Sequence, residues 1–366
     1  MKTITIDMRM IQYSGIGIYL KNLIPRIIEQ CPETRFILLG NNRELDSYNW
    51  SKAGNIDILH CEIPVFSAME PFLLLRKIPS NTDIYWCPHF NIPIGYKGTM
   101  LTTIHDILHI SLPKMAGQWY KTIYAQALIW YLTHKSAKII TVSNFTKQEL
   151  IKHLGTTGSK IIPIHCGVDE SWFHNPTEER KQAEPYLVYV GNVKRHKNLL
   201  NLVKAFETLT ELIPHKLIII GKKEGFITGD SEVEKYASKL GTRIEFTGFI
   251  EDAELRCYVA NAAAIVFPSF YEGFGLPLLE AMACGCPVIA SKAASIPEVC
   301  GEVALYFDPW DIQDIASKIK YFVDNEEVQK QLLEGGRMRA KTFTWKKCAD
   351  QTIDILQNLL NERIHI

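Results

Sequence analysis

The order of short apolar runs along the chain constrains the fold more than any other feature of the sequence. In the first half these runs cover 4–8, 36–39, 84–86, 101–104 and 139–142, and in the second half 186–190, 217–220, 244–246, 264–267 and 288–290. Helix-length segments separate the runs, and strands that alternate with helices build βαβ units around parallel sheets. Two such series in 366 residues predict an α/β chain with two doubly wound, Rossmann-like domains.

A change in composition marks the predicted domain boundary. The apolar pattern of the first half ends at 169–176, and a charged stretch at 177–184 precedes the strong run at 186–190. We therefore expect an N-terminal domain at 1–175 and a second domain at 176–344. Apolar side chains recur near helical spacing from 344 to 360, which predicts a final helix.

Composition and charge exclude several classes of protein. Lys plus Arg and Asp plus Glu both total 40, so the overall charge does not favour nucleic acid as a partner. The chain enters its first strand without a signal-peptide pattern, and its apolar runs are far shorter than a bilayer span, which predicts a cytoplasmic protein. Nine scattered cysteines without a C-x-x-C pair fit small-residue packing in a reducing compartment, and we expect no metal site.

The stretch from 267 to 283 carries the strongest chemical signal. A strand ends at Phe267, a loop with glycines holds Glu272, and Pro277 suits the first turn of a helix. The free N–H groups of that turn and the helix dipole form an anion site suited to a diphosphate. Glu280, about one turn into the helix, can accept two ribose hydroxyls, and Glu272 can accept from hydroxyls of a sugar. The loop residues assigned to this site are Gly273, Phe274, Gly275 and Leu276.

Two glycines near the N-terminus suggest a second approach to phosphate. Gly15 and Gly17 follow the first strand and allow close approach of the backbone. A dinucleotide fingerprint would need a third glycine where Leu20 stands, so a nicotinamide dehydrogenase is a weak alternative.

The stretch from Glu272 to Glu280 matches the E-x7-E segment of the retaining GT-B glycosyltransferases of family four. The segments 281–290, 295–299 and 305–309 extend the match, so the second half of the chain resembles this family. The resemblance implies a GT-B fold, in which two Rossmann-like domains face a central cleft and the final helix, within 345–366, rejoins the N-terminal domain.

The resemblance also implies roles for residues after other strands. Lys197 corresponds to a phosphate-binding lysine, while Asn192 stands where many members have an arginine. Arg195 is an alternative source of that charge, with a solvated basic turn as the competing interpretation. Phe249 borders the nucleotide base and either stacks on it or packs against the protein. The loop with Gly15 and Gly17 resembles a glycine loop that touches the donor.

The pair His105 and Asp106, at the end of a first-domain strand, resembles the family's sugar-transfer point. The resemblance implies that His105 contacts the transferred sugar and that Asp106 positions that sugar or the acceptor. No Asp-x-Asp pair occurs, so Lys197, the helix dipole and backbone amides are expected to replace a metal cation. Retention then follows from double displacement or from front-face attack within an ion pair.

The expected reaction is transfer of mannose from GDP-mannose, without a cofactor, to a saccharide or lipid-linked acceptor. The triplet 7–9, the His-Asp pair and the 191–199 segment resemble mannosyltransferases of bacterial surface-polysaccharide and O-antigen assembly. UDP- and dTDP-linked sugars are alternative donors, and a nucleotide-sugar epimerase or a non-catalytic sensor are alternative functions. The aromatic stretch 118–131 is interpreted as a core or acceptor-lining helix, with peripheral contact to the inner face of the membrane as the alternative.

Overall fold

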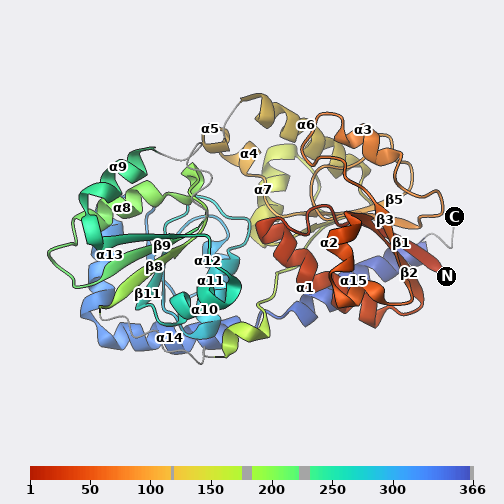
Figure 1. Cartoon of the computed structure of the whole chain (residues 1–366). Helices are drawn as coiled ribbons and strands as arrows, with labels where there is room; N and C mark the ends of the chain where they lie inside the picture. The colour runs from red at the N-terminus through yellow and green to blue at the C-terminus, as the bar shows by residue number, and fades with distance from the viewer. Residues whose placement is uncertain (117–118, 175–183, 222–230, 363–366) are drawn as a thin grey trace. The chain divides into compact units, whose positions relative to one another are not determined.

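The computed structural model describes residues 1–116, 119–174, 184–221 and 231–362. The chain divides into two compact units, each taken by itself here (Figure 1). Unit 1 comprises Met1–Gly167 and Thr344–Ile366, and unit 2 comprises Val168–Phe343. The division comes at Gly167, whereas the composition of the chain placed it at 175, beside a segment that lies outside the described residues.

Unit 1 is built on a seven-stranded parallel sheet in the order β3-β2-β1-β4-β5-β6-β7. Its strands are β1 (Lys2–Asp7), β2 (Thr34–Gly40), β3 (Ile56–His60), β4 (Ile84–Cys87), β5 (Thr99–Ile104), β6 (Lys138–Thr141) and β7 (Ile161–Pro163). Its helices are α1 (Ser14–Gln30), α2 (Asn42–Asp46), η1 (Asn49–Lys52), α3 (Glu70–Leu75), α4 (Leu108–Ser111), α5 (Pro113–Ala116), α6 (Trp119–Lys135) and α7 (Asn144–Leu154). The strand order changes direction between β1 and β4, the topological switch point of this unit.

The last helix of the chain, α15 (Trp345–Glu362), belongs to unit 1, as the GT-B resemblance implied. It lies beside α1 (Figure 1), and the Trp345 ring meets the Tyr19 ring of α1 with centroids 6.1 Å apart. Trp345, Cys348 and Leu356 are among its buried side chains, and their helical spacing gives α15 one continuous apolar face. Burial of that face fixes the helix to the unit in which the chain began.

Unit 2 carries a six-stranded parallel sheet in the order β10-β9-β8-β11-β12-β13. Its strands are β8 (Tyr186–Val190), β9 (Lys216–Ile220), β10 (Ile244–Gly248), β11 (Ala264–Phe267), β12 (Val288–Ser291) and β13 (Leu305–Phe307). Its helices are η2 (Glu170–Phe173), η3 (Arg195–Lys197), α8 (Leu199–Glu207), α9 (Ser231–Lys239), η4 (Gly241–Arg243), α10 (Asp252–Ala260), α11 (Leu276–Cys284), α12 (Ile296–Cys300), α13 (Ile312–Asp324) and α14 (Glu326–Ala340). The switch point of unit 2 lies between β8 and β11.

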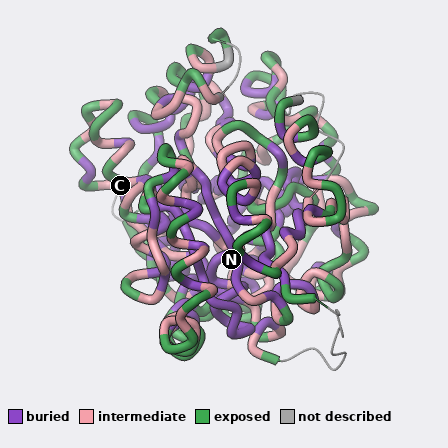
Figure 2. The backbone as a smooth tube through the Cα atoms, turned by 90° about the vertical axis from the view of Figure 1, so that its left-hand side faces the viewer, coloured by how far each residue is buried: buried purple, intermediate pink, exposed green. Residues whose placement is uncertain are grey.

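The central strands of both sheets are buried along most of their length because helices cover both faces of a parallel sheet. All four residues of β4, of β11 and of β12 are buried. Figure 2 shows this as buried backbone running through the strands, with exposed backbone on the outer helices. Every strand predicted from the sequence is present, and the fold class is confirmed as two Rossmann-like units.

Candidate functional site

Lys197 and Glu272 form an ion pair at the switch point of unit 2. Lys197 follows β8 at the end of η3, and Glu272 lies in the loop after β11, the strand beside β8. The Lys197 Nζ donates to both carboxylate oxygens of Glu272, at 2.6 and 2.9 Å. Their side chains are 19% and 12% exposed, so the pair is sheltered but still accessible to a ligand. The structure thus brings together two residues that the sequence assigned to phosphate and to sugar.

Asn198 holds the turn after β8 against the loop after β11. It adopts the left-handed conformation, with φ of 57°, and is buried. Its side-chain amide donates to the carbonyl of Pro268 at 3.0 Å and to that of Pro309 at 2.8 Å. The backbone N–H of Phe270 also donates to the carbonyl of His196 at 2.8 Å. These bonds fix the backbone on both sides of Lys197 and Glu272, so the ion pair is preorganised.

The loop after β11 leads directly into helix α11. Gly275 ends the loop with φ of 112°, a conformation that side chains disfavour, and Pro277 lies in the first turn. The first N–H groups of a helix have no acceptor within it and, with the helix dipole, favour an anion. The Ser295 hydroxyl lies within hydrogen-bond distance of the carbonyls of Glu272 and Phe274, at 2.9 and 2.8 Å, which holds the loop in place.

The residues assigned to this loop divide into backbone and side-chain roles. The Phe274 ring is buried against Phe343, with centroids 6.0 Å apart, so its side chain belongs to the core of unit 2. Gly273 and Leu276 are half-buried at the start of α11. Only the backbone of Phe274 therefore lies at the candidate anion site.

Glu280 lies in α11, eight positions after Glu272, and is half-buried. Burial, together with the nearby charges of Asp252 and Asp169, raises the pKa of its carboxyl to about 7. The carboxyl group of Glu280 makes no hydrogen bond to any other residue that the structure describes. A partly desolvated carboxyl without a hydrogen-bond partner in the protein is suited to bind the hydroxyls of a ligand.

The other donor residues proposed for unit 2 lie at the ends of different strands. Asn192 and Arg195 are exposed in the turn after β8, where the Tyr189 hydroxyl donates to the Asn192 carbonyl at 3.3 Å. Phe249 follows the edge strand β10, two strands from β8, and is 64% exposed. All three are accessible from the carboxyl edge of the sheet.

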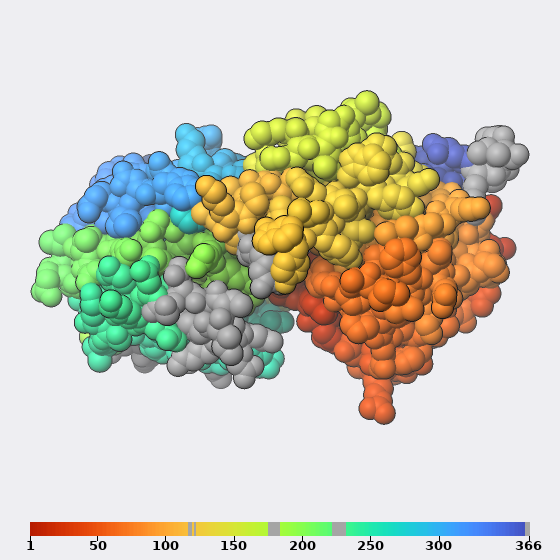
Figure 3. Space-filling model, turned by 90° about the horizontal axis from the view of Figure 1, so that it is seen from above, coloured from red at the N-terminus to blue at the C-terminus, as the bar shows by residue number. Residues whose placement is uncertain are grey.

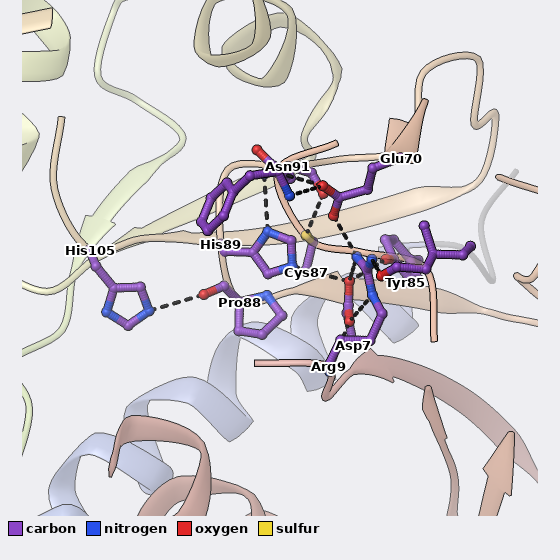
Figure 4. Close-up of polar contacts among 11 residues, drawn as sticks. Asp7, Arg9, Glu70, Tyr85, Cys87, Pro88, His89, Asn91 and His105 are labelled. Atoms are coloured by element: carbon purple, nitrogen blue, oxygen red, sulfur yellow. Dashed lines mark hydrogen bonds and ion pairs between the residues drawn. The ribbon is translucent and has the colours of Figure 1, made fainter. Parts of the chain in front are cut away.

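In unit 1, His105 follows β5 and is held as a neutral imidazole. Its Nε2 lies 3.0 Å from the carbonyl oxygen of Pro88 (Figure 4), so Nε2 carries the donated proton and Nδ1 keeps its lone pair. Burial lowers the pKa of His105 to about 4, although the bond to Pro88 acts in the opposite direction. His105 is therefore an acceptor at Nδ1 at neutral pH. The neighbouring Asp106 is exposed, and its carboxylate accepts from the Leu108 N–H at 3.0 Å.

The two glycines of α1 differ in what surrounds them. A Cβ at Gly17 would lie 2.4 Å from the Ile11 carbonyl oxygen, so packing within unit 1 already requires glycine there. A Cβ at Gly15 would meet nothing within 4 Å, and the residue is exposed. Of the pair, only Gly15 leaves open space beside its Cα.

A buried network of charged and polar residues occupies the switch point of unit 1 (Figure 4). Asp7, the last residue of β1, accepts from the Arg9 guanidinium at 2.6 and 2.9 Å. Arg9 also donates to Glu70 at 2.8 Å, and Glu70 accepts from the Asn91 amide at 2.6 Å. Burial opposes ionisation of Asp7, but the charge of Arg9 and the hydrogen bond from His89 lower its pKa.

His89 completes the network and connects it to His105. Its Nε2 lies 3.1 Å from Asp7, and its Nδ1 accepts from the Asn91 N–H at 3.1 Å, which identifies Nε2 as the protonated nitrogen. Pro88, whose carbonyl meets His105, directly precedes His89. Sequence reasoning missed Glu70, His89 and Asn91. The position of 88–91 directly after β4 is a signal that could have found His89 and Asn91, but not Glu70.

Asp7, Cys87 and His89 also lie close enough together to resemble a metal centre. The Arg9 guanidinium, however, already contacts both oxygens of Asp7. A cation beside the only carboxylate of the cluster would repel a metal ion, so these residues do not suit one. The triplet 7–9, which the sequence linked to donor choice, is a buried structural element of unit 1.

The comparisons with known proteins agree with this architecture. The family model of glycosyl transferases group 1 matches residues 170–339, and that of glycosyltransferase family 4 matches residues 15–172. The chain is 30% identical to O-antigen chain mannosyltransferase B of Escherichia coli, over 93% of this chain and 95% of the relative. The chain belongs to the family 4 glycosyltransferases.

A second sequence relative and one solved structure add to this comparison. The chain is 28% identical to O-antigen chain mannosyltransferase RfbU of Salmonella typhimurium, over 66% of this chain and 65% of that protein. Its fold is similar to that of Anabaena HepE, solved in complex with UDP and glucose, with a TM-score of 0.79, 17% identity, and coverage of 98% of this chain and 100% of that one. Family membership excludes two of the alternative functions, the nucleotide-sugar epimerase and the nicotinamide dehydrogenase.

Helix α6 of the glycosyltransferase has one buried and one exposed face. Ala125, Leu128 and Leu132 are buried, whereas Trp119, Ile123 and Trp130 are 74%, 56% and 53% exposed. The chain around this helix forms part of the surface seen in Figure 3. Helix α6 therefore contributes one face to the core of unit 1, and whether its other face lines an acceptor or contacts a membrane stays a prediction. Among the described residues, no helix is long and apolar enough to cross a membrane.

Proposed function

We propose that this glycosyltransferase transfers mannose from GDP-mannose, with retention of configuration and without a metal ion, to a saccharide or lipid-linked acceptor in surface-polysaccharide synthesis. The observation that carries the proposal is the Lys197–Glu272 ion pair beside the N-terminus of α11, at the switch point of unit 2. Ligands of open α/β sheets bind at such a point, outside the carboxyl ends of the strands.

Each part of this site suits one part of a sugar nucleotide. Lys197 and the first N–H groups of α11 are suited to the diphosphate, because both present positive charge. Glu280 is suited to the ribose hydroxyls, and Glu272 to hydroxyls of the sugar. The Lys197–Glu272 bond orients both side chains before the donor arrives, so little reorganisation is needed at the moment of reaction.

The same ion pair favours front-face attack over double displacement. A carboxylate whose two oxygens both accept from Lys197 is a poor nucleophile, so Glu272 is not expected to form a covalent intermediate. In the proposed step the bond between C1 of mannose and the diphosphate oxygen breaks, and the acceptor oxygen bonds to C1 from the same face. The acceptor proton passes to the departing diphosphate, whose charge Lys197 and α11 stabilise. For His105 we keep the role that the family resemblance implies, contact with the transferred sugar, to which its neutral imidazole offers a lone pair at Nδ1.

The choice of GDP-mannose rests on relatives. O-antigen chain mannosyltransferase B and RfbU are both named for mannosyl transfer, and the former matches nearly the whole chain. HepE was solved with UDP and glucose, which keeps UDP-sugars as the alternative donors. We further propose that the enzyme works in the cytoplasm, where the exposed face of α6 contacts the inner face of the membrane. Sedimentation with anionic vesicles that is unchanged when Trp119 and Trp130 are replaced by serine would contradict that contact.

Thermal shift with a panel of donors tests the proposal. GDP-mannose, UDP-glucose, dTDP-rhamnose and NAD are each added with and without EDTA. We expect GDP-mannose alone to raise the melting temperature, equally with and without EDTA, because binding to the folded state stabilises it. Turnover followed by NMR then gives the anomeric configuration of the product. Stabilisation by NAD alone, or an inverted product, would contradict the proposal, and stabilisation by a UDP-sugar would replace the donor.

A further inference from the structure

A hollow lies at the carboxyl ends of β12 and β13 in unit 2. Lys292 follows β12 and Asp308 follows β13, while Asp314 and Lys318 project from α13. The hollow has a volume of about 440 Å³, within the usual range for sites that bind small molecules. The hollow lies beyond β11 from the switch point that holds Lys197, and the two are neighbours, because Pro309 in the lining accepts from Asn198 at 2.8 Å.

The charges around the hollow favour a neutral ligand. The lining holds two lysines, Lys292 and Lys318, and two aspartates, Asp308 and Asp314, so its net charge is zero. Lys318 and Asp314 already pair with each other at 4.0 Å. A phosphate site needs an excess of positive groups, and a metal site needs an excess of oxygen ligands. Neither excess is present.

Trp310 supplies an aromatic surface at the rim of the hollow. Its indole stacks on the ring of Phe270, with centroids 3.9 Å apart and planes inclined by 29°. The side chain is nevertheless 63% exposed, so most of the indole remains accessible. A large exposed aromatic with a polar edge is a rigid, amphipathic contact surface. It suits the face of a sugar ring, which presents C–H groups, while the hydroxyls point outward from the ring.

Hydrogen-bonding groups surround this aromatic surface. The Lys292 ammonium and the Trp310 indole N–H make no hydrogen bond with the described residues. Asp308 accepts from the Trp310 backbone N–H at 2.9 Å through one oxygen, which leaves the second oxygen for a ligand. Two donors and a carboxylate acceptor around an aromatic ring match the hydroxyls of a hexose.

The hollow is directly connected to the loop that carries Glu272. Phe270, under the Trp310 indole, lies two residues before Glu272. On the other side, Ala293 lines the hollow, and Ser295 contacts the Glu272 carbonyl at 2.9 Å. Ala294 between them has φ of 53°, a conformation rare for residues other than glycine, so this short segment is held rigidly by its surroundings.

We propose that this hollow binds a neutral hexose unit of the saccharide acceptor, beyond the residue that receives the new sugar. That the bound saccharide is the acceptor rests on the proposed function, whereas saccharide binding itself does not. The expected ligand stacks one ring face on Trp310 and bonds through its hydroxyls to Lys292 and Asp308.

Saccharide binding to the full chain, without donor, tests the proposal. Methyl α-D-mannopyranoside and an α-linked mannotriose are titrated by calorimetry and by saturation-transfer NMR. We expect the trisaccharide to bind, and Trp310→Ala to weaken it about tenfold, the loss expected when an aromatic stacking surface is removed. Phe72→Ala removes an exposed aromatic side chain from α3 of unit 1, where no donor or acceptor role is assigned, and should change nothing. Because Trp310 is largely exposed, its removal should spare folding.

Acceptor kinetics separate this proposal from the proposed function. In Trp310→Ala we expect KM for the trisaccharide acceptor to rise about tenfold, with kcat and the KM for GDP-mannose unchanged. Equal affinity of wild type and Trp310→Ala for the trisaccharide would overturn the proposal. So would the absence of saccharide binding in a chain that GDP-mannose stabilises. Failure of every sugar nucleotide to bind or react would instead contradict the proposed function, while the saccharide titration would still decide about the hollow.

Discussion

The two units place ion pairs at equivalent points of similar sheets and use them differently. In unit 1 Arg9 and Asp7 are 3% and 0% exposed, and Glu70, His89 and the Ile63 carbonyl occupy most of their remaining hydrogen-bonding positions. In unit 2 Lys197 and Glu272 are 19% and 12% exposed, and the two hydrogen bonds between them leave acceptor positions on the carboxylate and a proton on the ammonium. One switch point is filled by the protein itself, and the other is available to a ligand.

The choice of cation follows from this difference. The planar guanidinium of Arg9 binds two carboxylates in fixed directions, which suits a permanent structural contact. The ammonium of Lys197 is a point charge on a flexible chain, so its third proton can reach a phosphate without a change in the backbone. We therefore infer that the ion pair of unit 1 contributes to folding and that of unit 2 contributes to catalysis.

The largest expected effect is on the stability of unit 1. Replacement of Arg9 by methionine leaves two buried carboxylates without their partner, which costs about 3–5 kcal/mol of the free energy of unfolding. Urea denaturation measures this loss. The control is Arg35→Met, which breaks an exposed pair with Asp57 and should cost about 1 kcal/mol or less. Similar losses in the two variants would show that burial does not distinguish these pairs.

The second expected effect is on turnover in unit 2. Lys197→Ala removes the cation beside the departing diphosphate and should lower kcat about 100-fold or more, since one such donor is typically worth that factor. Steady-state kinetics with GDP-mannose measure it, and the melting temperature should change little. Lys194→Ala, in the same turn but exposed, should behave like wild type. Turnover of Lys197→Ala within about threefold of wild type would remove the catalytic role.

The smallest expected effect is a pH dependence of opposite sign in the two units. The pKa of Glu280 rises from 4.5 in the unfolded chain to about 7, so its contribution to stability is lost as pH rises through 7. The pKa of Asp7 falls instead, so its contribution is present above 3.8 and is lost as pH falls.

Glu280→Gln tests this sign. The variant should melt at a higher temperature than wild type at pH 8 and at a similar temperature at pH 5. Its affinity for GDP-mannose should be lower than that of wild type and should no longer rise with pH, because the amide has no charge to gain. Glu334→Gln, at an exposed glutamate of α14, is the matched control. A variant less stable than wild type at pH 8 would contradict the raised pKa.

The sequence predicted the central strands and missed three strands, all at sheet edges. β3, β7 and β13 each end a sheet and have only one strand beside them. Their exposed or half-buried residues weaken the apolar signal, as the pattern of β3 shows, where no residue is fully buried. Central strands are covered on both faces, so most of their residues are buried and apolar residues are frequent in them.

The same distinction separates the site residues that could be predicted from those that could not. Glu272 and Glu280 were found because a loop, a glycine and a helix start follow one another within a few residues. Glu70 and His89 were missed because they meet Arg9 and Asp7 from 61 and 82 residues away. Phe274 was assigned to the donor site as a loop residue, and the structure adds that its ring lies in the core.

The sequence by itself determined which segments become the central strands, and where a helix N-terminus with its two glutamates stands. These features depend on neighbours in the chain, through apolar periodicity, the backbone freedom of Gly275 and the fixed φ of Pro277. Only the tertiary structure decided which charges meet. Lys197 reaches Glu272 across 75 residues because parallel crossovers bring β8 beside β11. Asp7 is buried and Lys197 is accessible because different segments pack against the carboxyl ends of the strands in the two sheets. No local sequence pattern specifies that packing.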